Sequence, residues 1–234
     1  QIHAANDDAS AVAVSLAREG TVAALMKGNV RTDDLMRAAV HRTRGIRGKK
    51  RPSHIFHMTV PGSNKSLCIT DAVINVLPKV KQKIEIADNA ADLLHALGIS
   101  NPNIALLSAT EVPTDQMPSS IEAAEIANQA RAGAITGATV DGPMAFDIAV
   151  SRKAADLKGV TSPVAGNADV LLVPNIEAGN ALFKQMVYFM SATAAGLVVG
   201  TTVPIALTSR ADPAEARLAS VALASIYAHH LGLN

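Results

Sequence analysis

The run ADVLLVP at residues 168–174 is the clearest sign of the fold class of this chain. It is a short, unbroken apolar segment that ends at a proline, and such a segment is typical of a strand buried on both faces of a sheet. Apolar residues at helical spacing follow it at 180–190 and occur earlier at 78–97. Strands and helices alternate in this way along the chain, which predicts an α/β fold with mostly parallel strand pairing.

The other elements follow from the same patterns. Strands are expected at 21–28, 52–58, 66–71, 103–108, 139–143, 168–174 and 203–208, and helices at 7–19, 32–40, 78–97, 119–132, 147–155, 180–190 and 212–231. The second and third strands are expected to form a hairpin. The last strand and helix could return to the first elements, which predicts an outer, discontinuous domain (1–46 plus 200–234) and a second α/β domain (47–199).

The composition excludes several classes of protein. The chain has 21 Lys+Arg and 20 Asp+Glu, and this formal net charge of +1 argues against a nucleic-acid-binding coat and against disorder. The single Cys68 excludes an intramolecular disulfide framework and a cysteine-rich zinc site. The most apolar stretch, 192–207, is interrupted by glycine, threonine and proline, so a strand–turn–strand is expected there and no membrane span. No basic-then-apolar leader is visible, so a cytoplasmic location is expected.

Polar residues directly follow four of the apolar runs. These are LMKG at 25–28, VDGP at 140–143, LVPN at 172–175 and ALTSR at 206–210. Because parallel strands all end at the same side of a sheet, the four turns are expected to contribute to one ligand-binding edge. For any single turn, the simpler interpretation is that glycine and proline only reverse the chain.

Ser209 and Arg210 are the most informative of these residues. They follow a strand and precede a helix whose first turn contains Asp212 and Glu215. A hydroxyl, a guanidinium and the amides of a helix N-terminus can bind an anion together, whereas the simpler interpretation is that Ser209 or Asp212 only caps the helix. The chain contains no G-x-S-x-G, G-x-G-x-x-G or P-loop motif, so the usual serine-hydrolase, dinucleotide and NTP sites are not supported.

Neither the histidines nor the basic residues form a recognisable metal or nucleic-acid motif. The seven histidines lack the spacing of a metal-binding set, and a structural role is expected for them. His54 and His57 are expected to face opposite sides of one strand. The run RTRGIRGKKR at 42–51 is interpreted as an exposed loop, or alternatively as a dock for a ligand that carries several phosphates.

Five blocks of sequence resemble the phosphate acetyltransferase/phosphate butyryltransferase family. They are LMKGNVRTDDLMRAAV (25–40), SHIFHM (53–58), VDGPMAFDIA (140–149), SPVAGNADVLLVPNIEAGNALFKQM (162–186) and PIALTSRADPAEARLASVALA (204–224). The blocks occur in the family's order and span essentially the whole chain. The chain is most similar to the acyltransferase part of enzymes of the enoyl-CoA hydratase/phosphate acetyltransferase type. Family members usually begin with further βα units, so the outer domain is expected to be incomplete at its N-terminus.

The resemblance implies a two-domain fold like that of isocitrate and isopropylmalate dehydrogenases, with a cleft between the domains, and it implies a homodimer. It also implies the reversible reaction acyl-CoA + phosphate ⇌ acyl phosphate + CoA, in which an acetyl or other short acyl group passes directly between substrates in a ternary complex. Coenzyme A is then a substrate, and neither a metal nor a redox cofactor is expected. The likeness of fold to dehydrogenases does not transfer their function.

The same resemblance implies roles for single residues. Arg210 is expected to hold phosphate bidentately, and Ser209 to hydrogen-bond the reacting carbonyl or the thiolate. Lys27 and Thr32 are expected to complete an anion pocket. The cleft is expected to be lined by Asn180 and Lys184 of the G-N-x-x-x-K block and by Asp141, Gly142 and Pro143.

One position departs from the acetyl-specific members of the family. In those members an aspartate seven residues after the serine is taken as the base that deprotonates coenzyme A, and here that position is Ala216. Asp212 and Glu215 lie nearby and are the candidate catalytic carboxylates. Asp147 is a further candidate, with an equally good interpretation as a helix cap. The base and the length of the acyl group are therefore both unassigned.

Two other classes of function stay open on the sequence. A non-catalytic α/β protein that binds coenzyme A or acyl phosphate would keep the fold and lose the base, which fits Ala216. A decarboxylating dehydrogenase would need paired aspartates for a metal ion and a nicotinamide pocket. The sequence shows no clustered aspartates at strand or helix spacing, so this second class ranks low.

Overall fold

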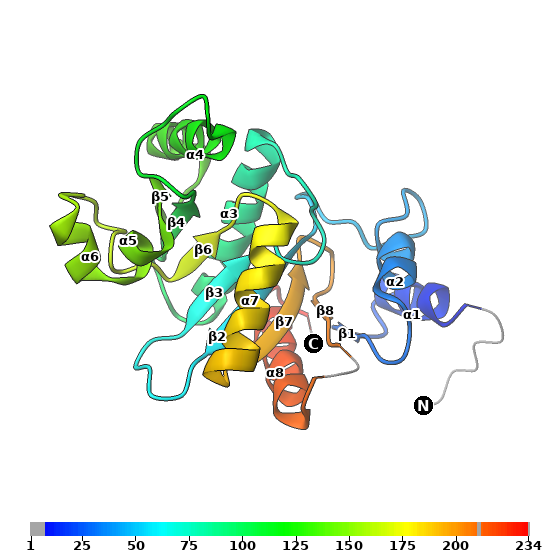
Figure 1. Ribbon diagram of the computed structural model, residues 1–234. Helices are drawn as coiled ribbons and strands as arrows, with labels where there is room; N and C mark the ends of the chain where they lie inside the picture. Colours follow the sequence, from blue (N-terminus) through cyan, green and yellow to red (C-terminus); the bar gives the residue numbers. More distant parts are fainter. Residues whose placement is uncertain (1–7, 210–211, 234) are drawn as a thin grey trace. The chain divides into compact units, whose positions relative to one another are not determined.

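The computed structural model describes residues 8–209 and 212–233 (Figure 1). Within these residues the chain divides into two units. The terminal unit contains the residues up to Pro52 together with those from Ala194 onwards, and the central unit runs from Ser53 to Thr193. In the part of the chain described, no helix is long and apolar enough to cross a membrane.

The boundaries of these units differ from those expected after residues 46 and 199. The segment after Ile46 stays with the terminal unit because Arg47 forms an antiparallel bridge with Thr201 and the Gly48 amide donates to the carbonyl of Gly200 at 3.2 Å. Glycine is needed at position 48, since a Cβ there would collide with that carbonyl. The basic run is therefore anchored to the terminal unit at Arg47 and Gly48.

The central unit contains a sheet with the strand order β2-β3-β6-β4-β5. The strands are β2 (Ser53–Thr59), β3 (Leu67–Thr70), β4 (Asn103–Leu107), β5 (Thr139–Met144) and β6 (Val170–Leu172). Strands β3, β6, β4 and β5 pair in parallel, and β2 pairs with β3 as an antiparallel hairpin. The apolar run 168–174 thus forms the middle strand of this sheet, and the expected α/β class with mostly parallel pairing is confirmed.

Helices cover this sheet (Figure 1). They are α3 (Val80–Ala96), α4 (Pro118–Gln129, followed by a π-helical turn at Ala130–Ala134), α5 (Phe146–Val150), α6 (Arg152–Leu157) and α7 (Ile176–Met190). Helix α3 packs on β2, β3 and β6, helix α7 packs on β3, and helix α4 packs on β4 and β5. The core residues include Ile69, Ile86, Leu93, Ile104, Leu106 and Leu171, all fully buried. Burial of each such side chain contributes roughly 1.5–3 kcal/mol.

The terminal unit combines elements from both ends of the described chain. Its strands are β1 (Leu25–Met26), β7 (Thr193–Val199, whose first residue falls in the central unit) and β8 (Ile205–Ala206), and its helices are α1 (Ala9–Arg18), α2 (Thr32–Ala39) and α8 (Ala214–His230). Strand β1 pairs in parallel with β8, and β8 pairs antiparallel with β7. The stretch 192–207 therefore forms a strand, a turn and a strand, as expected.

Three elements differ from their expected bounds. The strand expected at 21–28 has only the two paired residues of β1. The helix expected at 147–155 is broken into α5 and α6, because Ser151 has an extended backbone and its hydroxyl caps α6 by accepting from the amide of Ala154 at 3.3 Å. Helix α7 begins four residues earlier than expected, because Asn175 caps it by accepting from the amide of Ala178 at 2.9 Å. The turn LVPN thus ends in a helix cap.

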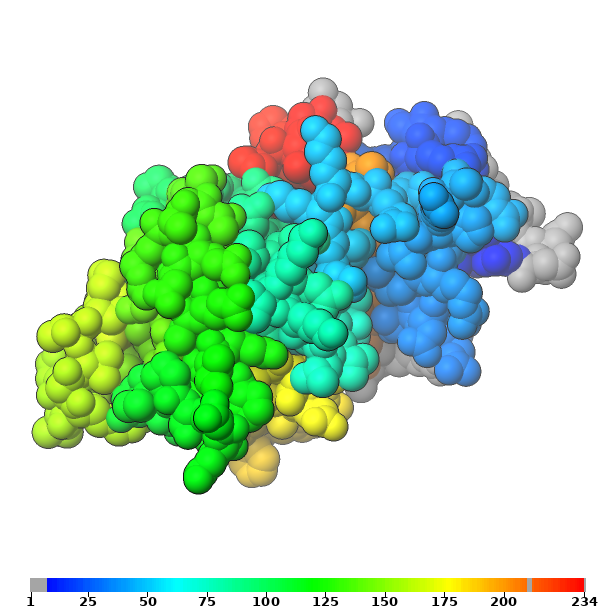
Figure 2. Space-filling model, turned by 90° about the horizontal axis from the view of Figure 1, so that it is seen from above, coloured from blue at the N-terminus to red at the C-terminus, as the bar shows by residue number. Residues whose placement is uncertain are grey.

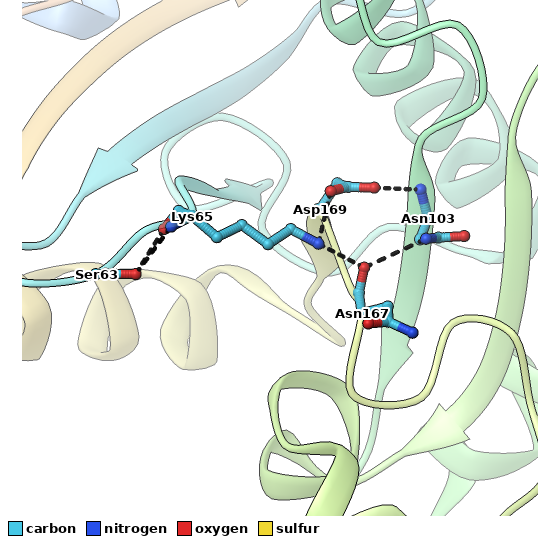
Figure 3. Close-up of polar contacts among 5 residues, drawn as sticks. All are labelled: Ser63, Lys65, Asn103, Asn167 and Asp169. Atoms are coloured by element: carbon cyan, nitrogen blue, oxygen red, sulfur yellow. Dashed lines mark hydrogen bonds and ion pairs between the residues drawn. The ribbon is translucent and has the colours of Figure 1, made fainter.

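A polar network fastens the amino ends of three strands in the central unit (Figure 3). Lys65, just before β3, forms an ion pair with Asp169 at 2.7 Å, and its ammonium also donates to the carbonyl of Asn167 at 2.7 Å. The second carboxylate oxygen of Asp169 accepts from the amide of Asn103 at 2.7 Å. Because Asp169 precedes β6 and Asn103 begins β4, these contacts hold three neighbouring strands at one edge.

Candidate functional site

Two segments expected in the site meet at the carboxyl edge of the terminal unit. Strands β1 and β8 run in parallel, so Lys27 and Thr208 follow their strands on the same side. The amide of Lys27 donates to the carbonyl of Ala206 at 2.9 Å, and the hydroxyl of Thr208 donates to the carbonyl of Lys27 at 3.1 Å. Ser209 therefore follows directly on a residue that is tied to Lys27. Arg210 lies outside the described residues.

The side chain of Lys27 is buried, with only 6% of the residue exposed. Its ammonium donates to the carbonyl oxygens of Gly28 and Val30, both at 3.3 Å. Among the residues described, no carboxylate forms an ion pair with Lys27. A buried cation that is satisfied only by neutral carbonyl groups favours an anion beside it. Thr32, half-buried at the start of α2, lies two residues beyond Val30.

Ser209 and Asp212 are joined by two hydrogen bonds. The amide of Ser209 donates to Asp212 Oδ2 at 2.6 Å, and the amide of Asp212 donates to the carbonyl of Ser209 at 3.2 Å. Glu215 is exposed in the first turn of α8. Ala216, the position of the missing carboxylate, is 4% exposed and faces the core. Neither Asp212 nor Glu215 therefore occupies the place that Ala216 leaves.

A cavity of about 1060 Å³ lies between α1 and α2 in the terminal unit. Its charged lining residues are Arg18, Arg31, Arg37, His41 and Arg44 together with Asp8 and Asp34. Arg37 pairs with Asp34 at 3.2 Å, and Arg31 pairs with Asp33 at 3.5 Å. Arg18 and Arg44 form no ion pair with another described residue, so the cavity keeps an excess of positive charge.

The basic run 42–51 is exposed but has a defined conformation. Figure 2 shows this segment at the surface of the protein. His41 Nδ1 accepts from the amide of Arg44 at 3.2 Å, and Ile46 is only 1% exposed. Arg44 lines the cavity and Arg42 does not. The sequence alone singled out this run as basic, but it held no signal for which of its arginines face the cavity.

Asp141, Gly142 and Pro143 lie inside β5, which ends one residue later than the strand expected at 139–143. The carboxylate of Asp141 accepts from Arg131 at 3.2 Å and from the amide of Gly142 at 3.0 Å. A Cβ at Gly142 would lie 2.7 Å from the carbonyl oxygen of Leu106, so glycine allows β5 to approach β4 closely. Pro143 is buried. These three residues take part in the packing of the sheet.

Asn180 and Lys184 lie one turn apart on α7. The side-chain amide of Asn180 donates to the carbonyl of Ala72 at 3.4 Å, and Lys184 is exposed. Helix α7 can approach Ala72 this closely because residue 179 is a glycine. A Cβ at this position would lie only 3.0 Å from Ala72 Cα. Asn180 is thus tied to the loop that follows β3.

That loop is organised by Asp71, a residue that the sequence patterns did not single out. Its carboxylate is buried and accepts from the amides of His54 (3.1 Å), Val73 (2.9 Å) and Ile74 (2.9 Å) and from the side chain of Asn75 (2.6 Å). Burial raises the pKa of Asp71, and the hydrogen bonds to its carboxylate oppose this rise. The available signal was an aspartate directly after an apolar strand, the same kind of signal that selected Lys27.

His54 is fully buried near this carboxylate. Burial lowers the pKa of His54 from 6.5 to about 3. Its ring stands edge-on to Phe56 with the centroids 4.3 Å apart, and Phe56 stacks on Phe183 of α7 at 4.0 Å. No described residue is a hydrogen-bond partner of either ring nitrogen. His54 is therefore a neutral imidazole packed as an aromatic residue.

The described residues offer neither a metal cluster nor a reactive thiol. Within 8–209 and 212–233, no three His, Cys, Asp or Glu side chains are placed to hold one metal ion. Cys68 is buried, and burial raises the pKa of its thiol to about 12, with a smaller contribution from the charge of Asp169. A thiol in this state is not a nucleophile at neutral pH.

Comparisons with known proteins agree with the resemblance in the sequence. The chain matches the family described as phosphate acetyl/butaryl transferase over residues 1–225. It is 50% identical over 220 residues to a phosphate acetyltransferase of Rhizobium meliloti, a match that covers 94% of this chain and 70% of that protein. It is 41% identical over 216 residues to a phosphate butyryltransferase of Clostridium acetobutylicum, covering 92% and 72%. Over eight such relatives, the chain spans 62% to 76% of their length.

Solved structures show the same likeness. A branched-chain phosphotransacylase from Enterococcus faecalis V583 superposes with a TM-score of 0.89 at 36% identity, covering 98% of this chain and 82% of that one. A 4-hydroxythreonine-4-phosphate dehydrogenase from Klebsiella pneumoniae superposes with a TM-score of 0.53 at 15% identity, covering 94% and 69%. The second likeness concerns the fold alone.

Proposed function

The chain belongs to the phosphate acetyl/butaryl transferase family, and we propose that it transfers a short acyl group reversibly between coenzyme A and inorganic phosphate. A phosphate oxygen attacks the thioester carbonyl, a C–O bond forms, the C–S bond breaks, and the phosphate proton passes to the sulfur of coenzyme A. Two anionic substrates have to meet in one ternary complex. The reaction therefore needs fixed cations and a hydrogen-bond donor at the developing oxyanion.

The observation that carries this proposal is the parallel pairing of β1 with β8, which brings the segments of Lys27 and Ser209 to one sheet edge. Phosphate is proposed to bind beside the buried ammonium of Lys27 and near Thr32, with Arg210 as its bidentate partner. Ser209 is proposed to hydrogen-bond the reacting carbonyl or the departing thiolate. Asp212 and Glu215 are the carboxylates proposed to assist the reaction, and Asp212 does so through its contact with Ser209.

Coenzyme A is proposed to place its phosphate groups in the cationic cavity between α1 and α2. The support is the volume of the cavity, about 1060 Å³, which suits a ligand much larger than inorganic phosphate. A second support is that Arg18 and Arg44 have no carboxylate partner among the described residues. From the central unit, Asn180 and Lys184 are proposed ligands, with Asp141, Gly142 and Pro143 as further lining.

A protein that binds coenzyme A or acyl phosphate without catalysis is the second candidate. The buried Ala216 favours it, because alanine supplies no proton acceptor at a position where acetyl-specific relatives have an aspartate. The nearby Asp212 favours catalysis instead, because it is in direct contact with Ser209.

Four broader properties are also proposed. The reaction is proposed to need no redox cofactor, since no electrons are transferred, and no metal ion; coenzyme A enters as a substrate. A homodimer is supported by the exposed apolar side chains of Tyr188, Phe189 and Met190 at the end of α7, which self-association could bury. A cytoplasmic location is proposed, where acyl-CoA and phosphate are both available. The architecture of isocitrate and isopropylmalate dehydrogenases is proposed for this chain. It is supported by the mostly parallel strand pairing and by the likeness of fold to the 4-hydroxythreonine-4-phosphate dehydrogenase.

Phosphate-dependent release of free thiol from acetyl-, propionyl- and butyryl-CoA tests the proposed function. We expect release to require phosphate and to fall by about 100-fold or more in Arg210→Ala, because a positioned charge at the transferring group is lost. Lys153→Ala, which removes an exposed cation of α6, is the matched control and should keep full activity. Binding of coenzyme A without release from any of the three esters would favour the non-catalytic candidate.

A further inference from the structure

We infer that Asp212 is a positioning residue for Ser209, and this inference rests on the acyl transfer proposed above. The sequence left two roles for Asp212, that of a helix cap and that of the base. The geometry favours a third role, in which its carboxylate holds the backbone of Ser209 in place.

The contact between the two residues is reciprocal. Asp212 Oδ2 accepts from the amide of Ser209 at 2.6 Å, while the amide of Asp212 donates to the carbonyl of Ser209 at 3.2 Å. A bond from an amide to an ionised carboxylate is short and roughly twice as strong as a bond between neutral groups. The two bonds close a ring between the backbone of Ser209 and Asp212.

Asp212 does not cap the helix that follows. The N-cap position of α8 is Pro213, whose side chain forms no cap hydrogen bond. The carboxylate of Asp212 is turned back toward the strand instead of forward to the helix amides. The bond of this side chain thus goes to Ser209, which gains a charged acceptor, and not to an amide of the first turn of α8.

Ser209 is thereby held in place by contacts of Thr208, which precedes it, and of Asp212, which follows it. On one side, the hydroxyl of Thr208 donates to the carbonyl of Lys27 at 3.1 Å. On the other, Asp212 accepts from the amide of Ser209 itself. The two contacts set the position of Ser209 relative to Lys27, and a misplacement of about 1 Å in such a site can lower the rate by about 100-fold.

Two substitutions separate positioning from proton transfer. Asp212→Ala removes the acceptor, and we expect kcat to fall by about 30- to 100-fold while the KM for acyl-CoA changes by less than about 3-fold. The side-chain oxygen of Asn in Asp212→Asn can accept the same hydrogen bond, so this variant should recover to within about 5-fold of the wild-type kcat. Asp156→Ala, which removes an exposed carboxylate of α6, controls for the loss of one negative charge.

A second readout does not depend on turnover. Hydrogen exchange of the Ser209 amide should accelerate by about 10-fold or more in Asp212→Ala and stay slow in Asp212→Asn, at equal unfolding midpoints. Wild-type turnover in Asp212→Ala would overturn the inference. An Asn variant as inactive as the Ala variant, with its amide still protected, would do so as well and would assign proton transfer to the carboxylate. If the wild type releases no thiol, the acyl-transfer function itself fails, and slow exchange at Ser209 still reports the contact.

Discussion

The hydroxyl of Thr208 donates to the backbone carbonyl of Lys27 at 3.1 Å, although the two residues are 181 positions apart in the chain. The bond is buried and joins the ends of two parallel strands. Thr208→Val keeps the shape of the side chain but removes the donor. We expect it to lower the free energy of unfolding by about 1–3 kcal/mol, because a buried acceptor loses its partner.

Urea unfolding measures this loss, and thiol release measured on the folded variant gives its effect on kcat. Thr208→Ser keeps the hydroxyl and is the control, with an expected change in unfolding free energy below about 1 kcal/mol. If Thr208→Val were as stable and as active as the wild type, the bond to Lys27 would have no part in arranging this edge.

The network around Asp169 should affect stability and leave the kinetics alone, because it lies at the amino edge of the central sheet. Asp169→Asn removes the ion pair with Lys65, and its amide oxygen can still accept from Asn103. The side chain of Lys65 is half exposed, so we expect a loss of only about 0.5–1 kcal/mol. Asp169→Ala removes both contacts and should lower the free energy of unfolding by about 1–3 kcal/mol. A changed KM at unaltered stability would contradict this assignment.

The order of the elements could be predicted from the sequence because it depends on burial along short segments. The run 168–174 has no polar residue between Asp169 and Pro174, and such a run is typical of a strand in the middle of a sheet. The break at Ser151 and the early start of α7 at Asn175 could not be predicted. Each depends on one side chain that bonds a nearby amide, and the spacing of apolar residues does not report such bonds.

Of the candidate site, the sequence could predict the residues that follow apolar strands but not those brought together from separate segments. Lys27 and Ser209 were found because both follow apolar strands, and parallel pairing then brings their segments together. The cationic cavity was not found, since its arginines come from α1, α2 and the basic run and have no common spacing. Asp71 was missed because its four hydrogen bonds reach two separate segments of the chain.

Burial of His54 predicts a stability that decreases in acid. The folded protein keeps this imidazole neutral down to its pKa of about 3, whereas the unfolded chain binds a proton below the ordinary value of 6.5. The stabilisation is therefore complete above about pH 6.5 and is lost as the pH falls toward 3. Between about pH 7 and about pH 4, the difference in unfolding free energy between the wild type and His54→Phe should shift by up to roughly 3 kcal/mol against the wild type.

Two other groups near His54 titrate as well. Burial raises the pKa of Asp71, so the contribution of Asp71 to the free energy of unfolding increases as the pH falls, opposite to that of His54. Both the wild type and His54→Phe contain Asp71, so this contribution cancels in their difference. Burial also lowers the pKa of His57, but a backbone hydrogen bond opposes the shift, so His57→Phe should show a smaller change with pH. Identical pH dependence of unfolding in the wild type and in His54→Phe would show that the unfolding equilibrium does not sense this imidazole.

Arg44 and Arg42 are two positions apart, yet only Arg44 lines the cationic cavity. If this cavity holds the phosphates of coenzyme A, Arg44→Gln loses one charge-assisted contact, and the KM for acyl-CoA should rise by about 10-fold. The KM for inorganic phosphate should not change. Arg42→Gln removes the same charge from the same exposed run and should leave both KM values within about 2-fold of the wild type.

The salt dependence of these KM values distinguishes a specific contact from general attraction. The wild-type KM for acyl-CoA should rise with ionic strength, and the rise should be weaker in Arg44→Gln, because one cation fewer is available to be screened. Equal effects of Arg44→Gln and Arg42→Gln would mean that only the summed charge of the run 42–51 attracts coenzyme A. The phosphates would then have to bind outside the cavity. If they bound inside it, the loss of Arg44, which lines the cavity, would have a larger effect than the loss of Arg42, which does not.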